Sequence, residues 1–172
     1  MTDFLERDAR VYEGTTGHTV TSHHYPKRTL LDLAGDRGLR VASVSVPMTF
    51  PSWELNGVMV AGGFTPGDRV TCTPPGLAPR LDVGPLDLGS RLLELPPERQ
   101  EATLRDQLER HGELVDRILA LERFDLAVAV VHAPDNAHHC FWPGDGRPSH
   151  EDPRIADLYE RTDRFVGSVR CV

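Results

Sequence analysis

The spacing of apolar residues in the first half of the chain predicts a helix that leads into two strands. Leu30 to Ala34, followed by Gly35 and Gly38, has the pattern of a short helix that ends at glycine. The valine-rich stretches 41–46 and 57–61 each have the composition of a short strand. Residues 1–26 show no sustained period and are interpreted as loop or peripheral structure.

In the second half of the chain the spacing of apolar residues is more regular than in the first half. After Pro96, apolar residues recur at helical spacing for about six turns, which predicts a long helix that ends near Arg123. The run from Phe124 to Val131 is almost continuously apolar, as in a strand covered on both faces, so we expect it at the centre of a parallel sheet. Two more helices are predicted, at about 135–143 and 153–169. The inner side of the last one is expected to carry Ile155, Leu158, Tyr159, Phe165 and Val166.

Helices that alternate with buried strands predict a layered α/β/α fold with a mostly parallel sheet. A chain of 172 residues fits one domain. The stretch 68–97 is rich in Pro, Gly, Asp and Leu and is interpreted as an irregular insert within that domain. Ligands in such folds gather beyond the carboxyl ends of the strands, which directs attention to residues 132–142.

Composition narrows the classes of partner. A net charge of −7 argues against nucleic-acid binding through a broad basic surface, whereas a small phosphorylated ligand can still bind where a metal ion supplies positive charge. Cys72, Cys140 and Cys171 are scattered and form no CxxC pair, which favours a reducing compartment. No apolar run is long enough for a membrane span, and the N-terminus lacks the basic-then-apolar pattern of a signal peptide, so we expect a cytoplasmic protein that does not bind membranes.

Asp135 and His139 are the residues that most suggest chemistry. They are four positions apart in a predicted helix, so their side chains project from one face, and a carboxylate and an imidazole can share a zinc ion. An alternative is that Asp135 caps the helix and that His138 and His139 are ordinary surface histidines. His132, at the strand end, either lines a metal pocket or is a boundary histidine with satisfied hydrogen bonds. Trp142 is expected in the core or at the pocket wall.

A longer pattern of residues surrounds this pair. The stretch 124–167 contains Pro134-Asp-Asn-Ala-His-His-Cys-Phe-Trp142, and the stretch 47–66 contains Thr49-Phe-Pro-Ser52 and Asn56-Gly-Val-Met-Val60. This pattern resembles the type I phosphodiesterase/nucleotide pyrophosphatase family of the alkaline phosphatase superfamily. In that family a buried strand leads into a D-x-x-x-H-x-x-W segment that provides metal ligands.

The resemblance implies an incomplete alkaline phosphatase-like core in which Asp135 and His139 bind one of two metal ions, zinc in the first place and manganese as an alternative. It transfers no nucleophile, because the family's Ser or Thr nucleophile and its remaining ligands correspond to positions before Met1 and after Val172. We therefore expect a fragment of a metal-dependent phosphoric ester hydrolase. Its substrate would be a small phosphorylated molecule, and the isolated chain would have no appreciable activity.

Two alternatives come from other functional classes. The chain could be a non-catalytic α/β module that kept part of this fold and binds a partner or ligand without chemistry, or a small hydrolase that completes its site between chains. Missing neighbour strands would expose sheet edges, so self-association and marginal stability are further expectations. The loop Gly62–Gly67 lacks the Lys and Ser/Thr of a P-loop and is interpreted as a structural turn.

Overall fold

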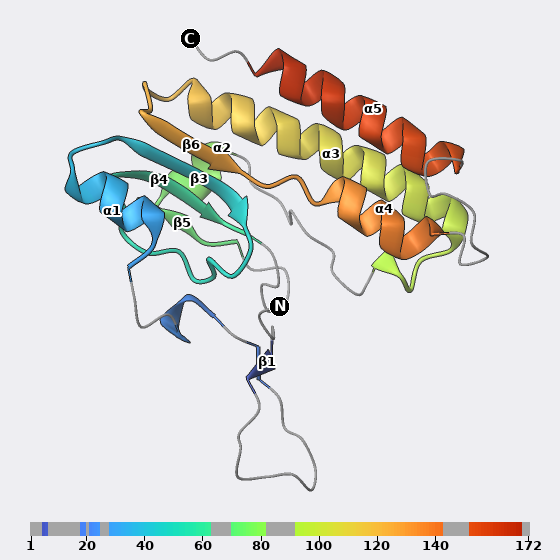
Figure 1. The fold of residues 1–172 in the computed structure, drawn as a ribbon, viewed down its shortest axis with the longest axis horizontal. Coiled ribbons are helices and arrows are strands. Elements are labelled where there is room, and N and C mark those ends of the chain that lie inside the picture. The colour runs from blue at the N-terminus through green and yellow to red at the C-terminus, as the bar shows by residue number, and fades with distance from the viewer. Residues whose placement is uncertain are drawn as a thin grey trace, which may run out of the picture.

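The computed structural model shows an α/β fold built on a four-stranded mixed sheet (Figure 1). It describes residues 5–6, 18–19, 21–24, 28–62, 70–81, 92–142 and 152–169. The strands are β1 (Leu5–Glu6), β2 (His18–Thr19), β3 (Val41–Val46), β4 (Gly57–Ala61), β5 (Cys72–Thr73) and β6 (Leu126–Ala129). The helices are η1 (Ser22–His24), α1 (Leu30–Asp36), α2 (Leu77–Leu81), α3 (Pro97–Leu119), α4 (Ala133–Phe141) and α5 (Pro153–Ser168).

The helix and strands predicted in the first half are confirmed, and α1 shows why. Thr29 and Asp32 form a capping box at its N-terminus, in which the Thr29 backbone N–H donates to the Asp32 carboxylate at 2.7 Å. After the C-cap residue Arg37, Gly38 adopts a φ of 79°, a conformation that glycine adopts without steric cost. The chain then turns directly into β3.

Strand β3 organises the sheet, whose order is β5–β4–β3–β6. It pairs in parallel with β4 on one side and with β6 on the other, while β5 pairs antiparallel with β4. A register shift between Val44 and Val46 marks a bulge at Ser45 near the carboxyl end of β3. Part of the stretch 68–97 that we expected to be irregular therefore joins the fold, because β5 extends the sheet and α2 packs beside it.

The expectation that the run 124–131 lies at the centre of the sheet is wrong for the part of the chain that the structure describes. There β6 is an edge strand, with Leu126 and Val128 half-buried while Ala127 and Ala129 are exposed. A continuous apolar run predicts that both faces of a strand can be buried. It does not predict how many strands pair with it. The free edge of β6 carries no charged residue, although charge commonly protects such edges from pairing with another chain.

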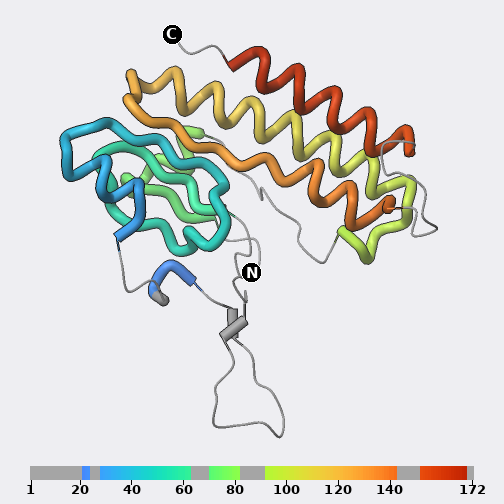
Figure 2. Tube along the Cα trace, viewed as in Figure 1, coloured from blue at the N-terminus to red at the C-terminus, as the bar shows by residue number. Residues whose placement is uncertain are grey.

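Helices cover both faces of the sheet and form a third apolar cluster beyond its end, where α3, α4 and α5 lie along one another (Figures 1 and 2). Helix α1 covers one face, with a cluster of Leu31, Ala34, Val41 and Met59. Helices α2 and α3 cover the other face, with a cluster of Ala42, Val44, Val58, Val60, Leu77, Leu81, Leu114, Val115 and Ile118. The third cluster contains Leu92, Leu104, Leu108, Ala133, Ala137, Phe141, Ile155 and Leu158.

Helices α3 and α5 follow the predicted ranges, with α3 ending at Leu119, a few residues before Arg123. The predicted inner side of α5 is correct only in part. Ile155 and Leu158 are buried and Phe165 is half-buried, whereas Tyr159 and Val166 are exposed. No helix in the described ranges combines the length and apolar character needed to cross a membrane.

Candidate functional site

Helix α4 begins soon after the carboxyl end of β6 and presents one buried and one exposed face. Ala133, Ala137 and Phe141 recur every four residues and pack into the third cluster. The opposite face is left to solvent. His132 is the N-cap residue of α4 and its side chain makes no capping hydrogen bond, so the alternative that Asp135 is the capping residue is wrong. Asp135 lies within the first turn instead, where a carboxylate interacts favourably with the helix dipole.

The structure brings Asp135 and His139 together on the exposed face of α4. Asp135 Oδ2 lies 3.6 Å from His139 Nε2, and the two side chains are 73% and 67% exposed. Two ligand atoms that each lie about 2.1 Å from a tetrahedral zinc ion are about 3.4 Å apart. The pair therefore fits two ligand positions of such an ion. Among the described residues no group of three or more His, Cys, Asp or Glu comes together, so any further ligand lies outside this set.

His138 does not join this pair but belongs to an aromatic group with Trp142 and Tyr159. Its ring centre lies 5.1 Å from that of Trp142 and 5.7 Å from that of Tyr159, the second contact being edge-to-face. His138 Nε2 and the Tyr159 hydroxyl share a hydrogen bond of 3.1 Å. Trp142 is 57% exposed, so of the two expected positions, the core and the pocket wall, the core is wrong. It follows α4 on the side opposite Ala137, and the core contact falls instead to Phe141.

His132 holds the end of β6 against the end of β3. Its Nε2–H donates to the Ser45 backbone carbonyl at 2.9 Å. This contact is the one expected of a boundary histidine with a satisfied ring nitrogen. It also fixes the proton on Nε2, since the carbonyl can only accept.

A buried polar contact at the carboxyl end of β3 was not found from the sequence. The bulge places Ser45 at a φ of 55°, and its hydroxyl lies 3.4 Å from His111 Nδ1 on α3, with both residues buried. Burial, together with the nearby charge of His132, lowers the pKa of His111 to about 4. His111 Nε2 has no hydrogen-bond partner among the described residues. The helical spacing of His111 marked it only as a member of the apolar face, and no signal in the sequence reveals the bulge.

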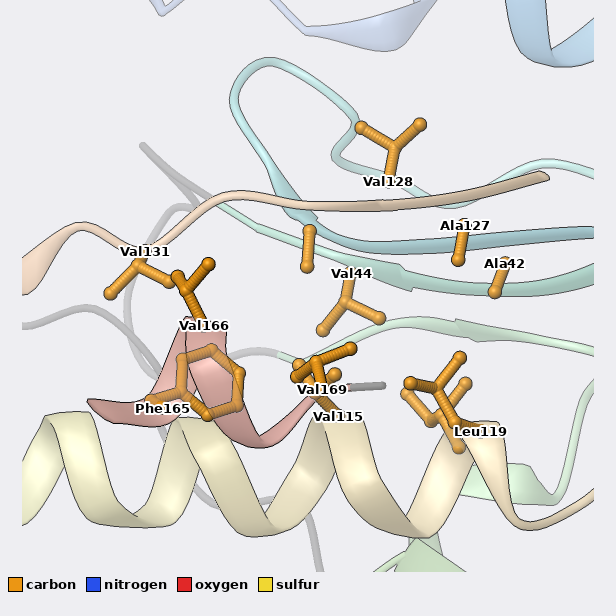
Figure 3. A pocket seen from close by; sticks show the side chains of 12 residues that line it. Ala42, Val44, Val115, Leu119, Ala127, Val128, Val131, Phe165, Val166 and Val169 are labelled. Carbon is orange, nitrogen blue, oxygen red and sulfur yellow. The ribbon is translucent and has the colours of Figure 1, made fainter. Parts of the chain in front are cut away.

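An apolar cavity of about 240 Å³ lies between the sheet and helices α3 and α5 (Figure 3). Ala42 and Val44 of β3 face Val115 and Leu119 of α3 across it, and Phe165 contributes from α5. None of its lining residues can bind a metal ion through its side chain. The cavity is therefore distinct from the Asp135–His139 pair.

Cys140 and two stretches outside the described residues complete the comparison with the sequence predictions. Cys140 is half-buried against the third cluster, and burial raises the pKa of its thiol, which agrees with a packing residue. The stretch 143–151, which includes part of the family-like pattern, lies outside the described residues, and so does 63–69, most of the glycine-rich loop.

No protein-family model, curated protein or solved structure matches this chain. The resemblance to the phosphodiesterase/nucleotide pyrophosphatase family therefore remains a hypothesis, based on the residues at 47–66 and 124–167.

Proposed function

We propose that this chain is part of a metal-dependent phosphoric ester hydrolase of the phosphodiesterase/nucleotide pyrophosphatase type, in which Asp135 and His139 bind zinc or manganese. The observation that carries the proposal is the distance of 3.6 Å between Asp135 Oδ2 and His139 Nε2, which suits two ligands of one ion. Their place also supports it, because they lie just beyond the carboxyl end of a parallel strand, where α/β folds bind ligands.

We further propose that the sheet belongs to an alkaline phosphatase-like core. The support is general: a mostly parallel sheet lies between helices, and the candidate metal pair follows β6. Among the described strands β6 lies at the edge of the sheet, and further strands of a larger core would pair with it there.

The pair supplies only part of a catalytic centre. Catalytic zinc is usually held by three protein ligands and a water molecule. A divalent ion at this site would polarise a phosphoryl oxygen and lower the pKa of an attacking hydroxyl. Within the described residues, Asp135 and His139 can hold and orient that ion. No nucleophile beside them is identified in this part of the chain.

We expect the isolated chain to show no appreciable hydrolysis of an aryl phosphodiester, even with added zinc or manganese, because the pair lacks the third protein ligand that catalytic zinc usually has. The measurement is steady-state release of the aryl alcohol by the purified protein. Asp135→Ala serves as the site variant. Asp106→Ala, which also removes an exposed carboxylate from a helical i,i+4 pair, serves as its matched control.

Turnover that survives purification, disappears in Asp135→Ala and persists in Asp106→Ala would contradict the partial-site account and favour a complete hydrolase. Zinc binding without turnover supports the proposal. If neither zinc nor manganese binds, the rival account of a non-catalytic module is favoured.

A further inference from the structure

Strand β6 leaves backbone hydrogen-bonding groups open along its outer edge. The Leu126 N–H donates at 3.1 Å to the carbonyl of the residue before β3. The Val130 N–H donates at 3.1 Å to the Val44 carbonyl, so the even-numbered residues of this strand bond to β3. Because successive residues of a strand direct these groups to opposite sides, the N–H and C=O of Ala127 and Ala129 point away from β3. Among the described strands none lies beside β6 on that side.

The side chains at the same two positions are small, apolar and open to solvent. Ala127 and Ala129 are exposed and line the apolar cavity between the sheet and helices α3 and α5. Figure 3 shows Ala127 on the cavity side of β6 and Val128 on the opposite side. Val166 of α5 is 59% exposed and borders the same cavity. Open hydrogen-bonding groups and open apolar surface therefore coincide on one edge, which is the arrangement that accepts an added strand.

The chemistry of this edge selects an extended and uncharged occupant. A strand added here pairs its backbone with Ala127 and Ala129 and places alternate side chains over the cavity. A charged side chain in that position would lose its hydration without gaining a partner, because every residue that lines the cavity is apolar. A small apolar molecule would fill the cavity but would leave the N–H and C=O groups of the edge unpaired. The observations therefore favour a strand.

Strand β6 itself meets these requirements, so a second copy of the chain supplies the partner. The stretch 126–131 contains neither a charged residue nor a proline, the two features that commonly block strand addition. The strand at the other end of the sheet, β5, has only two residues and is followed by Pro74, which has no N–H to donate. Parallel pairing in register would place the Asp125 carboxylates of two copies side by side, whereas antiparallel pairing separates them.

We propose that two copies of this chain associate through β6, which pairs antiparallel with the partner's β6 about a two-fold axis at Ala129. The two sheets then form one continuous sheet. This register places Val131 of one copy opposite Ala127 of the other, so that the larger side chain covers the cavity beside the smaller one. The inference goes beyond the proposed function and does not rest on it, because a second copy and the strands of a larger core would compete for the same edge.

Sedimentation equilibrium of the full chain tests the association. A pairing of this length buries less than about 1,200 Å², the size of weak complexes, so we expect a dissociation constant on the order of 10 µM. Ala129→Lys should raise that constant at least about tenfold, because it places two ammonium groups side by side on the two-fold axis. Leu33→Lys adds the same charge at an exposed apolar residue of α1 and, as the matched control, should leave the constant unchanged.

Amide hydrogen exchange of the parent chain locates the interface without any substitution. The amides of Ala127 and Ala129 should exchange fast at protein concentrations below the dissociation constant and slowly above it. The amides of Leu126 and Val130 donate to carbonyls on the β3 side and should exchange slowly at both concentrations. Circular dichroism of Ala129→Lys checks its fold, which we expect to be intact because Ala129 is exposed.

A dimer that Ala129→Lys weakens and that protects the amides of Ala127 and Ala129 supports the proposal. A dimer that persists in Ala129→Lys, or that leaves those two amides unprotected, uses another surface and overturns it. A chain that stays monomeric far above the expected dissociation constant also overturns it and leaves the edge to the strands of a larger core. Zinc titration at Asp135 and His139 is a separate measurement, so the proposed function stands or fails independently of these results.

Discussion

Gly62→Ala, at the residue that follows β4, is expected to be strongly destabilising. A Cβ atom at Gly62 would lie 2.1 Å from Ser45 Cα and 2.5 Å from the Ser45 carbonyl carbon. These are backbone atoms of the bulge in β3, so they cannot move aside as the end of a side chain can. We expect a loss of more than about 4 kcal/mol in the free energy of unfolding, a large fraction of the stability of a typical domain.

Urea unfolding of the parent chain and of Gly62→Ala, followed by far-ultraviolet circular dichroism, measures this loss in the free energy of unfolding. Gly167→Ala is the matched control, because a Cβ at Gly167 meets no atom within 4 Å and the residue lies in α5. Alanine there should be neutral or should stabilise the chain by up to about 1 kcal/mol through helix propensity. Equal stability of Gly62→Ala and the parent chain would show that β3 and β4 do not approach each other as described.

Stability is expected to fall steeply between about pH 6.5 and pH 4 because of His111. Burial lowers the pKa of His111 to about 4 in the folded chain, below the ordinary value of 6.5 that it regains on unfolding. Above pH 6.5 the ring is neutral in both states and imposes no penalty. As the pH falls towards 4, the unfolded chain takes up a proton that the folded chain does not, which favours unfolding by about 3 kcal/mol in total.

The pH dependence of the free energy of unfolding, measured in urea at several pH values, tests this expectation. His111→Leu should flatten the slope between pH 6.5 and pH 4, since it removes the group that titrates only on unfolding. His23→Gln, which changes an exposed histidine, should leave the slope unchanged. A slope that is the same in His111→Leu and in the parent chain would contradict the burial of a neutral His111 beside Ser45.

The sequence predicted the helices well because the interactions that start, extend and end a helix join residues close together in the chain. The glycine that ends α1 and the helical period of α3 each act within a few residues, and both helices form where expected. The relation between Asp135 and His139 was predictable for the same reason, since four residues span about one helical turn.

What the sequence did not reveal depends on contacts between distant residues. The edge position of β6 depends on which strands lie beside it, and its apolar run would suit a central strand as well. The contact between Ser45 and His111 joins residues 66 positions apart and requires a bulge that redirects the serine. Trp142 is exposed because Phe141, its neighbour, takes the core position of α4.

The central claim is that Asp135 and His139 bind one metal ion together, and zinc titration against a competing chromophoric chelator tests it most directly. We predict one zinc ion per chain and a loss of at least about tenfold in affinity in either Asp135→Asn or His139→Gln. Because the two residues share one ion, the double variant should lose little more than either single variant. Zinc affinity that is unchanged in both single variants would contradict the claim.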